Sequence, residues 1–112
     1  MTAIAEYDPG WLRHRIVVEA PAGTSDAAGG QSVTWSTLAT LWSRIEPAGA
    51  AEKAIADHLA GVVTHAVMIR WREDIAGGMR ILYRGRSFRI LAVRDPDESR
   101  RYLLILAEEE RP

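Results

Sequence analysis

The chain of 112 residues contains no cysteine, which excludes disulfides, thiolate metal sites and a cysteine nucleophile. Its stability must therefore come from packing or from assembly with other chains. The chain also lacks any apolar run near the roughly 18 residues that a membrane-spanning helix needs, and its first residues, MTAIAEYDPGW, show no basic region followed by an apolar one. These absences suit a reducing cytoplasm and predict a protein that is neither secreted nor membrane-bound.

Residues that carry chemistry are few and scattered. His14, His58 and His65 lack the paired spacing of metal ligands, so each is more simply a partly buried ring with a local hydrogen bond. Neither Gly-Gly pair is followed by the Lys-Ser/Thr of a phosphate-binding loop, and no serine lies in a nucleophile elbow. The sequence therefore favours a protein that is not an enzyme and that needs no metal or cofactor.

Neither sign of charge dominates, because the formal net charge is −1, and this argues against a generic nucleic-acid-binding protein. The distribution is uneven, however. Between Arg70 and Arg101 there are nine arginines against five acids, whereas the rest of the chain has ten acids against five bases. We therefore expect an electrostatically two-sided domain.

The first part of the chain is predicted to form two strands. The segment LRHRIVVEAP, from Leu12 to Pro21, alternates in the manner of a strand and is expected to end at Pro21. The small, polar stretch from Ala22 to Gln31 is expected to be a flexible hairpin loop. Strand character returns in SVTWSTLATLWSRIEP, where the alternation slips around Leu38 to Leu41, as a β-bulge would explain.

An alanine-rich insert runs from Pro47 to Val63. Its apolar residues recur at helical spacing at Ala51, Ile55, Leu59 and Val62. This spacing predicts a short helix, with Pro47 in its first turn and Gly61 at its end. Because neither this insert nor the Ala22 to Gln31 loop carries much apolar surface, we expect both to be the least ordered parts of the chain.

The rest of the chain is predicted to form four strands. One is THAVMIRWR, and two more lie in GMRILYRGRSFRILAVRDPDE, which alternates apolar and basic residues on both sides of an Arg84-Gly85 step, as a β-hairpin with an arginine-rich face does. The last segment, RYLLILAEEE, is apolar on both faces and hence central or covered. A tight turn is predicted around Asp95, Asp97 and Glu98, because aspartate side chains form hydrogen bonds with the backbone in such turns. The three glutamates from Glu108 to Glu110 are expected to form a solvated tail.

Most of the aromatic residues are expected to be core, because they occur at strand spacing. The set consists of Trp11, Trp35, Trp42, Trp71, Tyr83 and Phe88. The element order β-β-α-β-β-β indicates a mainly β fold, a small antiparallel β-barrel or sandwich of six strands with one short inserted helix. Residues 1–10 are expected to form an N-terminal arm and residues 11–110 a single domain.

Together these segments resemble the phage head-tail joining family, the head-closure or stopper proteins of long-tailed bacteriophages. The resemblance covers about Leu12 to Glu109. Its most specific parts are Leu12 to Arg15, Trp42 through Glu46-Pro47, Thr64-His65, Arg70 to Ile75, Met79-Arg80, and Gly85 through Phe88 to Asp95-Pro96.

The resemblance implies a structural protein of the head-tail connector, or neck, that assembles as a homo-oligomeric ring of six or twelve copies below the portal and its adaptor. Such a ring retains the packaged DNA, without sequence specificity, and offers a docking surface to the tail terminator or tail tube protein. The implied location is the virion, assembled in the cytoplasm of the host bacterium, with no membrane. The Ala- and Arg-rich composition would also suit a gene transfer agent of a GC-rich bacterium.

Two candidate sites follow from the resemblance. Arg70, Arg80, Arg84 and Arg89 are expected to contact acids of a neighbouring subunit or partner rather than DNA, because a channel that grips phosphates would hinder DNA exit. In such rings an inserted segment projects into the lumen, which makes the Pro47 to Val63 insert the first candidate and the Ala22 to Gln31 loop the second. The candidate lumen residues are Glu52, Lys53, Ile55, Asp57 and His58.

Two alternatives remain from the sequence. One is a tail terminator or another neck ring protein; adaptors are mainly helical, which the strand count disfavours. The other is a free-standing nucleic-acid-binding β-barrel, which would need two or three aromatic side chains on an exposed face beside the arginines. Steeply salt-dependent binding to short DNA would favour that second alternative.

Overall fold

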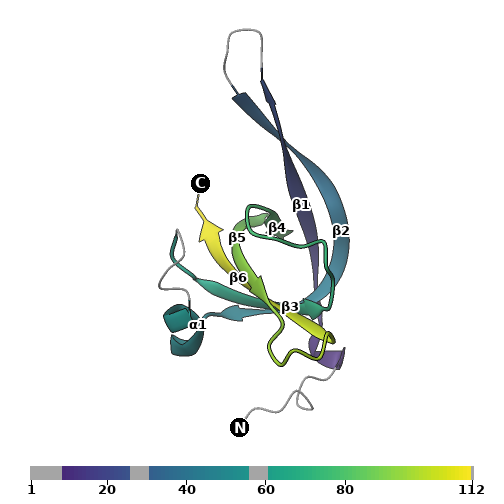
Figure 1. Ribbon diagram of the computed structural model, residues 1–112, viewed down its shortest axis with the longest axis vertical. Coiled ribbons are helices and arrows are strands. Elements are labelled where there is room, and N and C mark those ends of the chain that lie inside the picture. The colour runs from purple at the N-terminus through teal and green to yellow at the C-terminus, as the bar shows by residue number, and fades with distance from the viewer. Residues whose placement is uncertain (1–8, 26–30, 56–60, 112) are drawn as a thin grey trace.

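A single closed antiparallel β-barrel forms the body of the computed structural model, which describes residues 9–25, 31–55 and 61–111 (Figure 1). The strand order around the barrel is β1-β2-β3-β6-β5-β4, and β4 closes the sheet onto β1. The strands are β1 His14–Ser25, β2 Gln31–Pro47, β3 His65–Arg70, β4 Arg80–Tyr83, β5 Arg86–Arg94 and β6 Tyr102–Glu110. The 3-10 turn η2 (Pro9–Trp11) precedes β1, and the helix α1 (Ala50–Ile55) lies between β2 and β3. The predicted barrel with one inserted helix is confirmed.

β1 and β2 are longer than the barrel that they help to build. They pair along their whole length, whereas β4 pairs only with Val17–Glu19 of β1 and β3 only with Ser43–Pro47 of β2. The distal parts of the two strands therefore pair only with each other and project away from the barrel (Figure 1). We call this projection, formed by Ala20–Ser25 and Gln31–Ser36, the β1–β2 ribbon.

The expected end of the first strand at Pro21 is wrong. Pro21 lies inside β1, opposite Trp35, and proline is tolerated there because β1 has no neighbour other than β2 at this point. Residues 22–25 and Gln31 consequently belong to strands, and residues 26–30 of the expected loop lie outside the described residues. The predicted β-bulge is confirmed.

The bulge lies at Leu38. Val18 pairs with Ala39 and Glu19 pairs with Thr37, which leaves Leu38 as the extra residue on β2. It resets the alternation of β2, so that residues on either side of the bulge can face the same side of the sheet.

The predicted β4–β5 hairpin is confirmed, and its turn is tight. Arg84 and Gly85, between the two strands, have positive φ angles of 49° and 75°. Positive φ at both central residues is what a type I′ turn requires, and this turn matches the right-handed twist of the paired strands. Only one of the two positions is a glycine, so Arg84 adopts a backbone conformation that residues other than glycine rarely take.

The core fills the inside of the barrel. The described residues that are fully or nearly fully buried and share one cluster include Ile16, Val18, Val67, Ile69, Ile81, Phe88, Ile90, Leu103 and Ile105. Phe88 is the largest fully buried side chain, and Tyr83 is also buried. The prediction that both are core is confirmed, while Trp71 packs against the core from a partly buried position.

β6 is covered on its outer side as well, as its sequence predicts. Leu103, Ile105 and Ala107 face the barrel interior, whereas Leu106 is buried in a second cluster with Val63. Ala48 also packs there, so both ends of the inserted segment lie on the outside of β6.

The helix α1 begins later than the sequence predicts. Pro47 is the last residue of β2, paired with His65, and so it does not occupy the helix's first turn. The Gly49 N–H donates a hydrogen bond to the carboxylate of Glu52 at 2.8 Å, which is how an N-terminal cap is satisfied by the third residue of a helix. Of the expected apolar stripe, Ala51 is exposed. With six residues, the one helix of the described chain falls far short of a membrane span.

The loop before β6 confirms the expected turn chemistry. The Asp95 carboxylate accepts hydrogen bonds from the N–H groups of Asp97 and Arg100, at 3.3 and 2.7 Å, and Asp97 accepts one from Ser99 N–H. Side-chain to backbone bonds of this kind are the reason that aspartate is favoured in tight connections.

Candidate assembly surfaces

The outward side of β4, β1 and β2 carries an aromatic and arginine-rich surface. In β1, Ile16 and Val18 are buried, so the residues between them face out of the barrel. Their register partners on β2 and β4 share that side of the sheet. We call the resulting surface the outer aromatic face; it includes Arg15, Val17 and Glu19 with their partners Trp42, Leu82 and Arg80, and, farther along the same side, Trp35 and Val33, which pair with Pro21 and Gly23.

Arginine guanidinium groups lie over the tryptophans of this face. The Arg80 guanidinium lies 4.2 Å from the centre of the Trp35 ring, and its Nε donates to a Glu19 carboxylate oxygen at 2.7 Å. The Arg15 guanidinium lies 5.3 Å from the Trp42 ring centre. Trp42 remains 53% exposed, which is unusual for the largest apolar side chain and makes it a candidate contact residue.

The expectation that most of the six aromatic residues are core is therefore wrong, because only Tyr83 and Phe88 are buried. None of the four tryptophans belongs to the buried core. Trp11, like the two tryptophans of the outer aromatic face, lies beneath an arginine, because the Arg44 guanidinium is 4.9 Å from its ring centre. Cation–π contact and the arginine stem shield part of each ring from water, so a surface position is tolerated. The pairing of Trp42 with Arg15 across β1 and β2 would have revealed this arrangement, but the register depends on the bulge at Leu38.

The structure does not place the four predicted interface arginines on one surface. Arg80 and Arg89 are register partners on β4 and β5, Arg84 lies in the turn that joins those strands, and Arg70 ends β3. Two strands separate β3 from β4 in either direction around the barrel. Arg80 and Arg89 already have acidic partners within the chain, whereas among the described residues the structure shows no ion pair for Arg70 or Arg84.

Arg89 and Glu108 form an ion pair at 2.9 Å that also holds the end of the insert. Gly61 crosses directly over the pair: its φ is +137°, and a Cβ there would lie 2.7 Å from the Glu108 carboxylate. The hydrogen bond from Arg89, together with one from the backbone of Val62, lowers the pKa of Glu108. Glycine at position 61 therefore allows the insert to close down on β5 and β6.

A second row of charged groups lies nearby, at the end of β5 and β6. Arg86 donates two hydrogen bonds to the Glu109 carboxylate, at 2.8 and 2.9 Å, and also contacts His65 Nε2 at 3.4 Å. Its guanidinium lies 4.9 Å from the centre of the Phe88 ring. Ser87 donates to Glu110 at 3.1 Å. Glu108 to Glu110, for which the sequence predicts a solvated tail, are strand residues with partners on β5, and of the three only Glu110 is exposed.

His65 provides a prediction about pH. Burial, followed by the positive charge of Arg86, lowers the pKa of His65 below 6.5, and the carboxylate of Glu109 opposes this shift. As the pH falls below 6.5, the unfolded chain therefore binds more protons than the folded chain, which favours unfolding. The contribution of neutral His65 to the stability of the fold is complete above pH 6.5 and declines below it. We expect the urea midpoint to fall between about pH 7.5 and pH 5.5, and to fall less in His65→Gln. If the urea midpoint fell equally with pH in the natural protein and in His65→Gln, this pH dependence could not be assigned to His65.

The other described histidine also has a local partner. The Tyr83 hydroxyl lies 2.7 Å from Nδ1 of His14, and His65 Nδ1 lies 2.9 Å from the Thr64 hydroxyl. Both rings therefore have the local hydrogen bonds expected of them. Within residues 9–25, 31–55 and 61–111, no group of three or more histidine or acidic side chains is placed to hold a metal ion.

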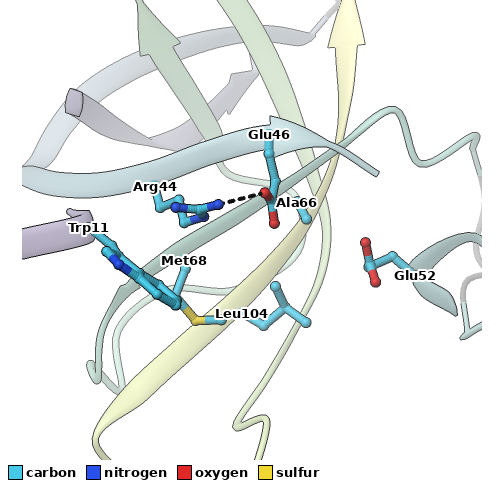
Figure 2. Close-up of a pocket in the computed structure, with 7 residues that line it drawn as sticks. All are labelled: Trp11, Arg44, Glu46, Glu52, Ala66, Met68 and Leu104. Atoms are coloured by element: carbon cyan, nitrogen blue, oxygen red, sulfur yellow. Dashed lines mark hydrogen bonds and ion pairs between the residues drawn. The ribbon is translucent and has the colours of Figure 1, made fainter. Parts of the chain in front are cut away.

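A shallow groove lies between η2 and α1 on the outside of the barrel, with a volume of about 250 Å³ (Figure 2). Its floor is apolar and comes from β3 and β6, and Figure 2 shows Trp11 lying along one side and Glu52 of α1 at the other. Arg44 and Glu46 form an ion pair at 3.2 Å across its upper wall. The remaining lining residues are Ala66, Met68 and Leu104.

A second groove, of about 300 Å³, borders the outer aromatic face. It is lined by Leu12, Thr40, Leu41, Trp42, Arg70, Trp71 and Arg72. Arg70 therefore lies beside the exposed Trp42, even though it is remote from the β4–β5 hairpin. Neither groove is enclosed, which suits contact with a protein surface better than enclosure of a small ligand.

The candidate lumen residues are only partly described. Glu52 is half-buried at the groove of Figure 2, and Lys53 is exposed on α1. The side chain of Ile55, and all of Asp57 and His58, lie outside the described residues.

Comparison with known proteins gives a consistent result. The model of the phage head completion protein family matches residues 7–110. The chain is similar to protein SF1141 from Shigella flexneri 2a, with a TM-score of 0.72 and 30% identity over 92% of this chain and 96% of that one. It is also similar to a chain of the virion of a native gene transfer agent particle, with a TM-score of 0.65 and 25% identity over 88% and 96% of the two chains. No curated protein matches the chain.

Proposed function

The chain belongs to the phage head completion protein family, and from this premise we propose that it is the head-closure protein in the neck of a tailed phage or a gene transfer agent. In this proposal six or twelve copies form a ring below the portal and adaptor. The ring keeps the packaged DNA in the head and presents a docking surface to the tail terminator or tail tube protein. Assembly takes place in the cytoplasm of the bacterial host.

The outer aromatic face is the observation that best supports an assembly role. Val33 and Trp42 are 57% and 53% exposed although the barrel has a complete core of its own. Within a lone monomer the exposed Trp42 gains only its contact with Arg15, whereas protein interfaces are enriched in both residue types. We therefore assign this face to contacts between subunits or with the adjoining ring.

Of the four predicted interface arginines, Arg70 and Arg84 are the better candidates for contacts between chains. Both are exposed, and within the described part of the chain the structure shows no ion pair for either. Arg80 and Arg89 are engaged by Glu19 and Glu108, so in the ring they support the surface from within the subunit. The insert between β2 and β3, with Glu52 and Lys53 on α1, is proposed to face the channel.

Removal of the gene from the parent phage or gene transfer agent tests this function. We expect heads that package DNA, lose it on purification and carry no tails, with rescue when the chain is supplied from a plasmid. Electron microscopy and the DNA content of purified heads provide the readout. Heads that retain DNA and join normal tails would contradict the proposal, and closed heads with defective tails would indicate a tail terminator.

The nucleic-acid-binding alternative has its own test. Short double-stranded DNA is titrated against the purified protein at increasing salt. A head-closure protein should bind it weakly at physiological salt, whereas tight binding that falls steeply with salt would favour the alternative.

A further inference from the structure

We propose that neighbouring copies of this chain pair edge to edge through the β1–β2 ribbon, with β2 of one copy adding to β1 of the next. The inference rests on the proposed function, because it needs a ring of copies, and it adds to that function the contact that joins them. Its occupant is a second copy of this chain.

The ribbon carries the longest open strand edges among the described residues. Within the barrel, each strand has a neighbouring strand on both sides over at least part of its length. On the ribbon, by contrast, β1 has no second partner from Ala20 to Ser25 and β2 has none from Gln31 to Ser36, and the open edge of β2 continues past the ribbon as far as Trp42. The backbone N–H and C=O groups on these edges are available to another strand.

The open edges of β1 and β2 carry almost no charged residues. Between Ala20 and Ser43, Asp26 is the only charged residue, in a chain of which 26% of the residues are charged. Soluble proteins usually protect an exposed edge with charged side chains or proline, because an open edge invites pairing with another chain. Here β1 has Pro21, while the open edge of β2 has neither proline nor charge. The edge of β2 is therefore suited to accept a strand.

The lack of charge also favours a second copy as that strand. Identical charged edges repel each other, and an edge that bound DNA would need basic residues, which the ribbon lacks. Small side chains face one side of the ribbon, where Ala20 pairs with Ser36 and Ala22 with Thr34. Nothing bulky on that side obstructs the approach of a neighbouring ribbon.

The geometry of the ribbon suits a ring. β1 and β2 are antiparallel, so copies related by rotation about one axis bring β2 of one copy alongside β1 of the next in antiparallel orientation. Each copy offers one edge of each kind, and the contact repeats until the ring closes. An isolated two-stranded ribbon is only marginally stable in water, and pairing on both edges would remove this weakness. Pro21 withholds one donor from the β1 edge, which restricts the registers that can form.

Cysteine cross-linking tests the proposal, because the natural chain contains no cysteine. Single variants Ala20→Cys and Ala22→Cys mark β1, and Thr34→Cys and Ser36→Cys mark β2. Each β1 variant is co-expressed with each β2 variant in a host that lacks the natural gene, and purified particles are oxidised. We expect at least one of the four mixtures to give a disulfide-linked band of twice the chain mass. Either β1 variant alone should give none.

Three outcomes would overturn the proposal. The first is cross-linking by a β2 variant alone, which would mean that β2 of one copy lies against β2 of the next. The second is cross-linking to a different virion protein, and the third is the absence of a cross-linked band in every mixture. Arg94→Cys, at the exposed end of β5, serves as the control position and should not cross-link with any ribbon variant.

Failure of the edge contact is distinguishable from failure of the function. If the cysteine variants restore tailed, DNA-filled particles but do not cross-link, the chain is a neck protein whose copies meet elsewhere. If removal of the gene leaves the particles intact, the proposed function itself is wrong.

Discussion

Phe88→Ala is expected to lower the free energy of unfolding by about 3–5 kcal/mol. The ring is completely buried in the core of the barrel, where it forms a T-shaped pair with the His65 ring, the ring centres lying 5.0 Å apart. Strands that are hydrogen-bonded on both sides cannot move inward to fill the cavity, so the loss should lie in the upper part of the range for such truncations. This loss is a large share of the total free energy of unfolding of a domain, which is roughly 5–15 kcal/mol.

Urea denaturation followed by tryptophan fluorescence measures this loss. The matched control is Trp42→Ala, which removes a larger but exposed ring and should cost about 1 kcal/mol or less, chiefly its contact with Arg15. A Phe88→Ala protein that kept its stability but failed to assemble would move Phe88 from the core to a partner contact.

The double variant Arg70→Glu/Arg84→Glu is expected to reduce the yield of tailed particles on the order of 100-fold. Exposed ion pairs are weak, and we take the two arginines of one subunit to contribute about 0.5 kcal/mol together; six copies in the proposed ring repeat this contribution, which amounts to about 3 kcal/mol. The fold should not change, because both side chains are exposed and, in the described part of the chain, neither forms an ion pair. The main internal loss is the contact of Arg84 with the Tyr83 ring, 5.3 Å away.

Particle yield and the thermal midpoint of the purified variant are measured together. Arg70→Lys/Arg84→Lys keeps both charges and should assemble nearly normally. A full yield from the glutamate variant would exclude these arginines from the interface, and a large fall in its thermal midpoint would show that they stabilise the fold. Arg80→Glu is unsuitable for this purpose, because it would place a second carboxylate against Glu19.

Most of the barrel is predictable from local patterns, since alternation and turn residues specify strands and hairpins on their own. The type I′ turn at Arg84-Gly85 and the two apolar faces of β6 are examples. Pro21 misleads because proline ends most strands, and only the absence of a second neighbour makes it acceptable inside β1. That absence is a property of the whole sheet.

The candidate site is less predictable because it depends on register and strand order. Glu109 appears as a solvated tail until β6 is paired with β5, where it meets Arg86. Trp42 appears to be core until the bulge in β2 places it opposite Arg15 on the outside. The four arginines form one face only if β3 and β4 are neighbours, and they are not. Each of these facts arises from contacts between segments that are distant in sequence.

The place of β6 has a consequence for how the protein is made. β6 is the last of the six barrel strands to leave the ribosome, yet it lies between β3 and β5. During translation the β1–β2 and β4–β5 hairpins can form as they emerge, but the gap between β3 and β5 stays open until β6 fills it. The nascent chain therefore completes its barrel only after β6 has emerged, and any contact that needs the closed barrel forms after that point.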